Sequence, residues 1–218
     1  MRLPGSIAQR LDVINRGTGQ LLGATEVTEL EDEGVAIQCR LEGTAPCIRL
    51  CLPKQGIKML RGQKCADFAL LLERAEDVFE AHILEFTTTV SLKKWDTVRE
   101  QLEWATLHVL AAAGILGIRI QGVVFYTVHH REDLSREGSR NPAVMKIPVS
   151  PRSEADAIRW AEARRSWESG RVSTANFGVD VEHLRIHAGE DGRTAVTCRP
   201  RSSSGEDDTL WVFEPVAG

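Results

Sequence analysis

Two apolar runs joined by a short acidic turn lie near the middle of the chain, in CADFALLLERAEDVFEAHILEFTTT from Cys65 to Thr89. Apolar runs of this length on either side of a turn predict a β-hairpin. If the turn marks the middle of the hairpin, Leu70 faces His82 and Asp67 faces Glu85 across the two strands. The pattern therefore predicts two acidic side chains opposite each other within otherwise apolar strands.

After Thr89 the period of the apolar residues changes from two to between three and four. This spacing predicts a helix from about Lys93 to Ala113, with Gly114 as its C-terminal cap. The apolar stretch from Ile118 to Val128 then predicts another strand. The central region is thus expected to run strand, strand, long helix, strand. The apolar face of the helix consists of Trp95, Val98, Leu102, Ala105, Val109 and Ala112.

The flanking regions carry weaker versions of the same two patterns. Before the hairpin we expect a short helix at Ser6–Asn15 and strands at Ala24–Leu30, Val35–Leu41 and Ile48–Leu52. A polar, arginine-rich stretch follows from His129 to Arg152. After it we expect a helix at Ser153–Ser169, with Ser153 as its N-cap. The tail is expected to form strands at Val181–His187 and Thr194–Arg199 and a last strand, LWVFEP.

Together these elements predict an α/β (α+β) protein with a central mixed sheet flanked by helices. We expect a core at residues 1–130, a polar excursion or linker at 131–152, and a C-terminal helix with strands at 153–218 that packs on the core.

Composition narrows the class of protein. Hydrophobic residues make up 42% of the 218 residues and charged residues 27%, which is ordinary for a globular protein with a hydrophobic core. The net charge of −4 shows that the chain as a whole is not a basic protein that binds nucleic acid by its overall charge. The N-terminus lacks the apolar core of a signal peptide, and the longest apolar stretch, Val109 to Ile118, is too short for a bilayer. Five cysteines are expected to be reduced, buried thiols rather than a zinc site. We expect a cytoplasmic protein with no membrane association.

The opposed acids are the main candidate for chemistry. Strand alternation places Glu85 and Thr87 on one face, and Leu84 and Phe86 on the other. Directly opposed side chains have Cβ atoms roughly 5 Å apart, and two carboxylates that close repel each other unless a cation or a proton lies between them. The alternative is that Asp67 is an exposed edge residue and Glu85 is solvated, since one face of an antiparallel sheet often is.

Three short motifs around these acids resemble the PD-(D/E)XK nuclease-like superfamily. They are KCAD at Lys64–Asp67, ILEFT at Ile83–Thr87 and EQL at Glu100–Leu102, and a helix and an apolar strand follow in the order typical of that family. The resemblance covers roughly Ser6 to Val128 and is best from Gly62 to Val128. It implies a restriction-endonuclease-like core.

The resemblance implies roles for particular residues. Asp67 and Glu85 match the metal-binding acids, the carbonyl of Phe86 matches a further ligand position, and Gln101 matches a helix residue that supports the site in some members. In active relatives the metal, usually Mg²⁺, activates water and neutralises charge that develops on the phosphate.

One position departs from the family pattern. Thr87 stands where the family has a lysine that supplies positive charge beside the scissile phosphate, and a threonine cannot do this. Lys93 or Lys94, at the start of the following helix, is a candidate for a displaced lysine, and Lys64 is a weaker one. We therefore expect Asp67, Glu85, Gln101, Lys93 and Lys94 to be the residues that matter for any catalysis.

We considered three functions. The first is a catalytically impaired PD-(D/E)XK-like subunit (a pseudo-nuclease) that associates with DNA or RNA, or scaffolds a multiprotein bacterial defence or DNA-processing complex. The second is an active Mg²⁺-dependent nuclease with a displaced lysine. The third is an α/β protein-interaction module without nuclease ancestry.

Other polar and aromatic features favour structural interpretations. His129 and His130 are expected to be a solvated pair at a strand end, although a general base or metal ligand is the alternative. Trp160 and Trp167 are expected in the core or on a partner-facing stripe rather than stacked on bases. Arginines between Arg159 and Arg171 alternate with acids, as on a solvated, ion-paired helix.

Overall fold

The computed structural model describes residues 6–11, 19–22, 27–42, 47–52, 65–134, 154–175, 177–201 and 210–216. Several predictions fall wholly or partly outside these residues: the second half of the first helix, the start of the strand at Ala24–Leu30, the position of Lys64, most of the polar excursion at 131–152, and the N-cap Ser153. None of the helices in the described part of the chain is long and apolar enough to cross a membrane.

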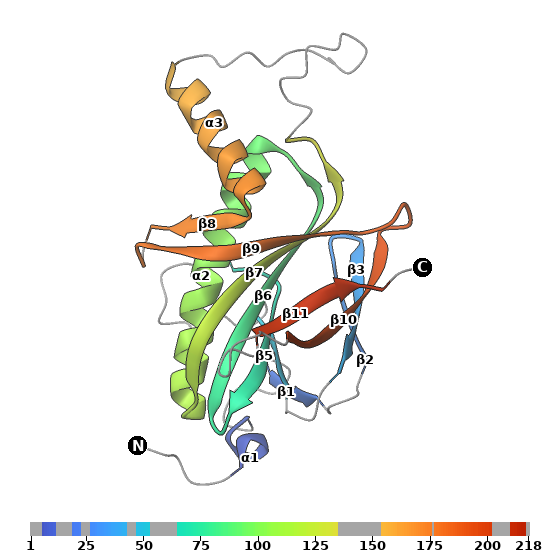
Figure 1. The fold of residues 1–218 in the computed structure, drawn as a ribbon, viewed down its shortest axis with the longest axis vertical. Helices are drawn as coiled ribbons and strands as arrows, with labels where there is room; N and C mark the ends of the chain where they lie inside the picture. Colours follow the sequence, from blue (N-terminus) through green and yellow to red (C-terminus); the bar gives the residue numbers. More distant parts are fainter. Residues whose placement is uncertain are drawn as a thin grey trace.

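The described strands form two mixed sheets (Figure 1). The main sheet has seven strands in the order β1 (Gly19–Leu22), β4 (Cys47–Cys51), β5 (Phe68–Ala75), β6 (Val78–Val90), β7 (Arg119–Glu132), β9 (Val179–His187) and β8 (Arg171–Thr174). The second sheet has four strands in the order β11 (Leu210–Pro215), β10 (Arg193–Arg201), β3 (Val35–Leu41) and β2 (Val27–Asp32).

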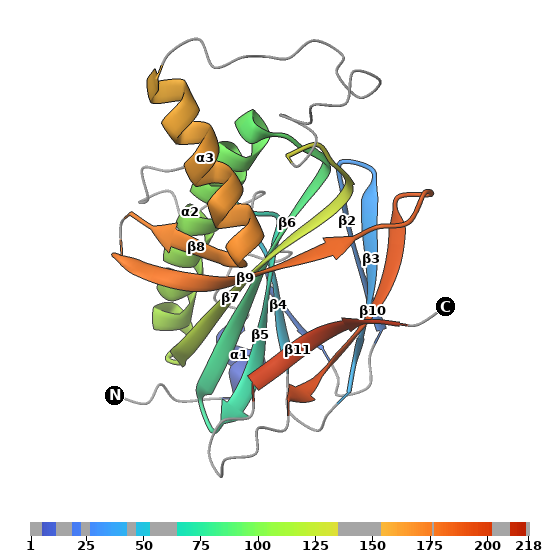
Figure 2. The same ribbon diagram turned by 45° about the horizontal axis from the view of Figure 1, so that its top comes forward.

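Three helices complete the described chain: α1 (Ile7–Leu11), α2 (Leu92–Leu116) and α3 (Glu154–Ser169). Helices α2 and α3 lie on one side of the main sheet and the second sheet lies on the other, as both views show (Figure 1, Figure 2). The predicted α+β class with a central mixed sheet is therefore confirmed. The sequence analysis did not predict the second sheet, which covers the face of the main sheet opposite the helices.

Most predicted elements occur close to their expected positions. The hairpin register is as predicted, with Leu70 opposite His82 and Phe68 opposite Leu84. Helix α2 runs one turn further than expected: Gly117, in the left-handed conformation at φ 66°, is its C-cap, whereas Gly114 lies inside the helix. Strand β1, at Gly19–Leu22, was not predicted.

The C-terminal third of the chain contributes strands that pair with strands from the first two thirds. Strand β9 pairs in parallel with β7 in the main sheet, and β10 pairs in parallel with β3 in the second. Residues 153–218, which we expected as an extension packed on residues 1–130, therefore supply strands to both sheets.

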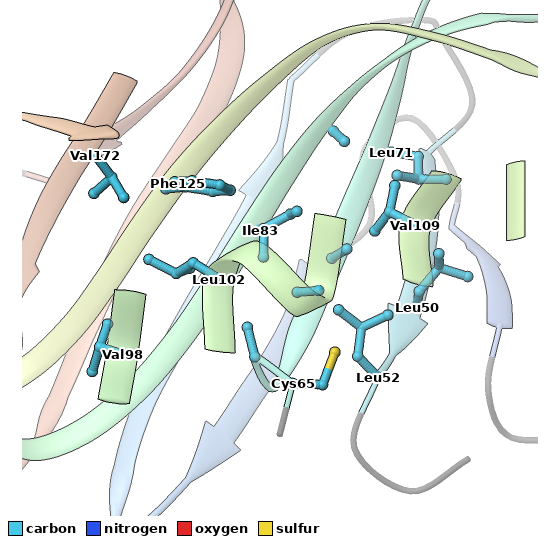
Figure 3. Packing of buried hydrophobic residues seen from close by; sticks show 14 of the residues in the cluster. Leu50, Leu52, Cys65, Leu71, Ile83, Val98, Leu102, Val109, Phe125 and Val172 are labelled. Atoms are coloured by element: carbon cyan, nitrogen blue, oxygen red, sulfur yellow. The ribbon is translucent and has the colours of Figure 1, made fainter. Parts of the chain in front are cut away.

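Two hydrophobic cores follow from this layering. The first lies between the main sheet and the helices, where Val98, Leu102 and Val109 of α2 pack over Ile83 of β6 and Phe125 of β7 (Figure 3). The second lies between the two sheets and contains residues such as Leu84, Phe86, Ile37 and Val196. Alternation along β6 thus directs Ile83 toward the helices, and Leu84 and Phe86 toward the second sheet, as predicted.

The second core holds a buried polar chain. The Nε2 atom of His82 lies 3.0 Å from Oε1 of Glu80, its Nδ1 atom lies 3.0 Å from the hydroxyl of Tyr126, and Phe213 of β11 packs against both rings. Glu80 also lies 3.5 Å from Arg74. Because its charged members are paired, we interpret this chain as a structural link between the sheets.

Cys39, Cys47, Cys65 and Cys198 are buried thiols of the two cores, and Cys51 is half-buried. Burial raises the pKa of Cys39 to about 12, so its thiol stays protonated at neutral pH. These cysteines match the expected buried thiols.

The β2–β3 turn at Glu33 and Gly34 is held against the β9–β10 turn. The N–H of Ala36 donates to the carbonyl of Gly192 at 2.9 Å, and a Cβ atom on Gly192 would lie only 2.7 Å from the carbonyl oxygen of Gly34. Gly192 also has a φ of +75°. Only glycine allows both the backbone conformation and the close approach.

We predict that Gly192→Ala lowers the free energy of unfolding by at least about 2 kcal/mol, because backbone strain and a steric clash add. Gly178→Ala is the matched control, since Gly178 has a similar φ of +63° but nothing within 4 Å of the added Cβ. The control should cost only about 1 kcal/mol. Urea unfolding of both variants measures the difference, and equal losses would show that the two turns are not in tight contact.

Candidate carboxylate site

The site forms where β6 continues beyond the start of β5. Asp67 immediately precedes β5, and its N–H donates to the carbonyl of Leu84 at 3.1 Å. Its Oδ2 atom accepts the N–H of Phe86 at 2.8 Å. The side chain of Asp67 thus takes a backbone donor of β6 at the point where the neighbouring strand stops. This contact fixes Asp67 opposite Glu85 at the end of the ladder, as the register predicted.

Both acids are removed from water. The exposed fraction is 8% for Asp67 and 2% for Glu85, so neither is the solvated edge residue of the alternative interpretation. The Oε2 atom of Glu85 is buried and has no hydrogen-bond partner in the described part of the chain. A buried carboxylate oxygen without a partner is costly, which indicates that a proton or a ligand belongs there.

Burial dominates the protonation of the pair. Burial raises the pKa of Glu85 well above its usual range, the negative charge of Asp67 raises it further, and the ammonium group of Lys94 lowers it. Burial also raises the pKa of Asp67, and a side-chain hydrogen bond with Asp32 adds to the increase. The metal-free pair is therefore expected to retain protons at neutral pH.

Asp32 and Glu33 are acids of the site that the sequence analysis missed. They come from the second sheet, at the end of β2 and in the β2–β3 turn. The hydroxyl of Thr88 on β6 donates to the carbonyl of Glu33 at 2.9 Å, which places this turn beside β6 where β5 is absent. The only available signal was the EDEG turn sequence, and nothing in it indicates what the turn packs against.

The candidate lysines differ in their placement. The ammonium group of Lys94 is near enough to Glu85 to influence it, but both oxygens of Glu33 lie 3.4 Å from its Nζ atom. Lys93 points to solvent, and Lys64 lies outside the described residues. Lys94 is thus the described lysine closest to the predicted role, and it is paired with Glu33 rather than with the site acids.

Thr87 occupies the lysine position without replacing its function. The side chain is 1% exposed, and its hydroxyl donates to the carbonyl of Thr89 at 3.3 Å. Gln101 lies beside the start of β5, since its backbone carbonyl accepts the N–H of Ala66 at 3.2 Å. Its side-chain oxygen is buried and unpaired within the described residues.

Two histidines lie on the same face of the sheet. His129, the neighbour of Thr87 across the β6–β7 pair, is 5% exposed and contacts Trp167, so the expected solvated pair was wrong at this position because α3 covers it. The Nε2 atom of His183 lies 2.9 Å from the hydroxyl of Thr127. Burial lowers the pKa of both, that of His183 to about 3. They are neutral at pH 7 and cannot supply the missing positive charge.

Trp160, Trp167 and Arg159 of α3 make packing and ion-pair contacts within the fold. Trp167 is buried against Trp95, and Trp160 is half-buried against the first core, which agrees with the predicted core role. Arg159 pairs with Asp96 of α2, so the acid partner comes from the neighbouring helix rather than from α3.

The carboxylate oxygens of Asp67 and Glu85 are chemically suited to a hard divalent cation. Carboxylate oxygens are the ligands that Mg²⁺ and Mn²⁺ prefer, and Mg²⁺ usually keeps several waters. As the side chains stand, no three His, Cys, Asp or Glu side chains of the described residues are grouped closely enough to hold an ion. Asp67 and Glu85 could therefore hold a cation only with water, a backbone carbonyl or a further side chain that moves.

The chain matches no family model, no curated protein and no solved structure.

We predict that Glu85→Gln stabilises the protein at alkaline pH. Because burial raises the folded-state pKa of Glu85 above its usual value of 4.5, the wild type loses stability as the pH rises above that value, since Glu85 ionises in the unfolded chain but stays protonated in the folded one. Glutamine removes this cost, so the free energy of unfolding should increase by about 1–3 kcal/mol at pH 8 and be unchanged near pH 4.

Urea unfolding at the two pH values measures this effect. Glu31→Gln, at an exposed position on β2, is the matched control and should leave the stability unchanged at both. A loss of stability at pH 8 in Glu85→Gln would mean that the ionised carboxylate is favourably paired.

Proposed function

We propose that this chain is a divergent PD-(D/E)XK-like subunit that retains the cation-binding acids and is impaired in phosphodiester hydrolysis. It associates with nucleic acid or scaffolds a larger bacterial defence or DNA-processing assembly. The observation that supports this proposal best is the placement of Asp67 opposite Glu85 at the start of β5, with one oxygen of Glu85 buried and unpaired within the described residues.

Three features favour impaired chemistry over an active nuclease. Thr87 fills the lysine position with a hydroxyl that is bonded to the backbone. Lys94 is paired with Glu33. In addition, Glu85 is only 2% exposed, so a phosphodiester cannot reach it without a change in conformation. A bound Mg²⁺ would supply water activation and charge neutralisation, but Lys94, the described lysine nearest the acids, is held by Glu33, and Lys93 points to solvent.

In this proposal the chain's own residues bind rather than react. Asp67 and Glu85 would hold the cation, while the N–H of Phe86 orients the carboxylate of Asp67 by its 2.8 Å contact. Gln101 would support the site from α2 through its buried side-chain oxygen. Cation binding would offset the cost of keeping two acids buried side by side.

An active Mg²⁺-dependent nuclease is the second candidate. It is favoured by one observation, the influence of the Lys94 ammonium group on Glu85. In that case Lys94 must leave Glu33 and turn toward the carboxylates. A protein-interaction module without nuclease ancestry is less well supported, because it gives no reason for Asp67 and Glu85 to converge.

We predict that Mn²⁺ binds the purified chain and that Glu85→Gln weakens binding at least tenfold, which is about 1.4 kcal/mol. Isothermal titration with Mn²⁺ measures the affinity, and Glu31→Gln is the matched control.

We further expect no Mg²⁺- or Mn²⁺-dependent degradation of single- or double-stranded DNA or RNA.

Degradation that disappears in both Glu85→Gln and Lys94→Met would instead establish the active nuclease with a displaced lysine. Failure of the wild-type chain to bind Mn²⁺ at pH 8 would remove the basis of the proposed cation site.

A further inference from the structure

Helix α2 has an apolar side that faces away from the fold. The helix lies on the outside of the main sheet, and its sheet-facing residues belong to the first core (Figure 1). A surface helix normally carries charged residues on its opposite side, but the stretch from Trp104 to Ile118 contains no Asp, Glu, Lys or Arg. Leu110 and Ile115 are 41% and 46% exposed, and Leu107 and Ala111 are half-buried. The second half of α2 is therefore apolar toward solvent as well as toward the core.

The apolar surface continues onto the β8–β9 turn. Val179, the first residue of β9, is 52% exposed. Together with Leu110 and Phe177 it lines a cavity of about 350 Å³ between α2 and this turn. Apolar side chains that are exposed singly need no explanation, whereas a group of them on one surface marks a place where another molecule binds.

Gly114 is an independent sign of a close approach from outside. It lies inside α2, where glycine is less favourable than alanine by about 1 kcal/mol. Its φ is not among the positive values, and a Cβ atom added to it would meet nothing within 4 Å. Neither the backbone conformation nor the packing of the chain itself therefore requires glycine here. A glycine is also used where a second backbone must come close, and the open surface above Gly114 leaves room for one.

We propose that the outer face of α2, formed by Leu107, Leu110, Ala111 and Gly114, packs against the same face of a second copy of this chain in an antiparallel twofold dimer. A twofold contact joins one surface to itself, so the surface must be complementary to its own copy. Pairing about a point between Leu110 and Ala111 satisfies this condition. Leu107 then meets Gly114 of the other copy, and Leu110 meets its Ala111, so each large side chain packs over a small one and the helix axes can approach closely.

The charges at the ends of the apolar stretch favour this occupant and this direction. Glu103 lies one turn before Leu107, and the exposed Arg119 follows the end of α2. An antiparallel pair brings the acid of each copy toward the base of the other, whereas a parallel pair would bring like charges together. A helix that lies on a membrane surface carries lysines and arginines on its polar side, but the polar residues before this stretch include Glu100 and Glu103. This inference is independent of the cation site proposed above.

The test is the association state of the wild-type chain and of Gly114→Lys. Sedimentation equilibrium from about 1 to about 100 μM should show the wild type approaching twice its monomer mass of 24.1 kDa. Lysine has room at position 114, suits a helix and favours its C-terminal end, so the melting temperature at a concentration where both proteins are monomers should not fall. The dissociation constant should rise at least tenfold, because an ammonium group enters an apolar contact.

Ala161→Lys, at an exposed position of α3, is the matched control and should associate as the wild type does. A wild type that stays monomeric over the whole range would overturn the dimer. Equal association of Gly114→Lys and the wild type would overturn the assignment of the contact to α2.

Disulfide trapping tests the antiparallel pairing. Oxidation of an equal mixture of Leu107→Cys and Gly114→Cys should give more cross-linked dimer than oxidation of either variant alone, because residues 107 and 114 face each other only between copies. Cross-linking that is no greater in the mixture would overturn the antiparallel arrangement.

Discussion

The early end of strand β5 is the constraint on which the candidate site depends. Strand β6 runs on without a β5 neighbour, and the side chain of Asp67 accepts a donor that the missing strand would otherwise have paired. This contact holds Asp67 opposite Glu85 where the pairing of β5 with β6 ends. The β2–β3 turn lies beside the unpaired part of β6 and brings two further acids, Asp32 and Glu33, of which Glu33 pairs with Lys94.

The electrostatics follow from this packing. Asp67 and Glu85 are buried, whereas the acids near them from β2 and the β2–β3 turn, Asp32 and Glu33, are exposed, and Glu33 pairs with Lys94. On the helix-facing side, the neutral histidines His129 and His183 add hydrogen-bonding groups but no charge. The described residues of the site thus bring negative charge and neutral imidazoles together and offer no positive charge to a phosphate other than that of Lys94.

The local parts of this arrangement could be predicted from sequence, and the long-range parts could not. The hairpin register could be predicted because two apolar runs flank an acidic turn. Helix α2 could be predicted because its apolar residues recur every three to four positions. The parallel pairing of β10 with β3 joins residues far apart in the chain, and no periodicity encodes it. For the same reason Asp32 was left in the EDEG turn after the predicted strand Ala24–Leu30, and His129 was placed in solvent because its contact with Trp167 is a tertiary one.

The unequal pairing of the buried acids distinguishes a structural role from a ligand-binding one. Glu80, buried between the two sheets, lies 3.0 Å from His82 and 3.5 Å from Arg74, although its carboxylate oxygens, like Oε2 of Glu85, accept no hydrogen bond within the described residues. Glu85 is equally buried but has no such ion pair among the described residues, and the negative charge of Asp67 raises its pKa. Both residues lie on β6, so one strand carries an acid with ion-pair partners and an acid without them. An acid kept for stability alone resembles Glu80, and the absence of such an ion pair at Glu85 is the feature on which the proposed cation site rests.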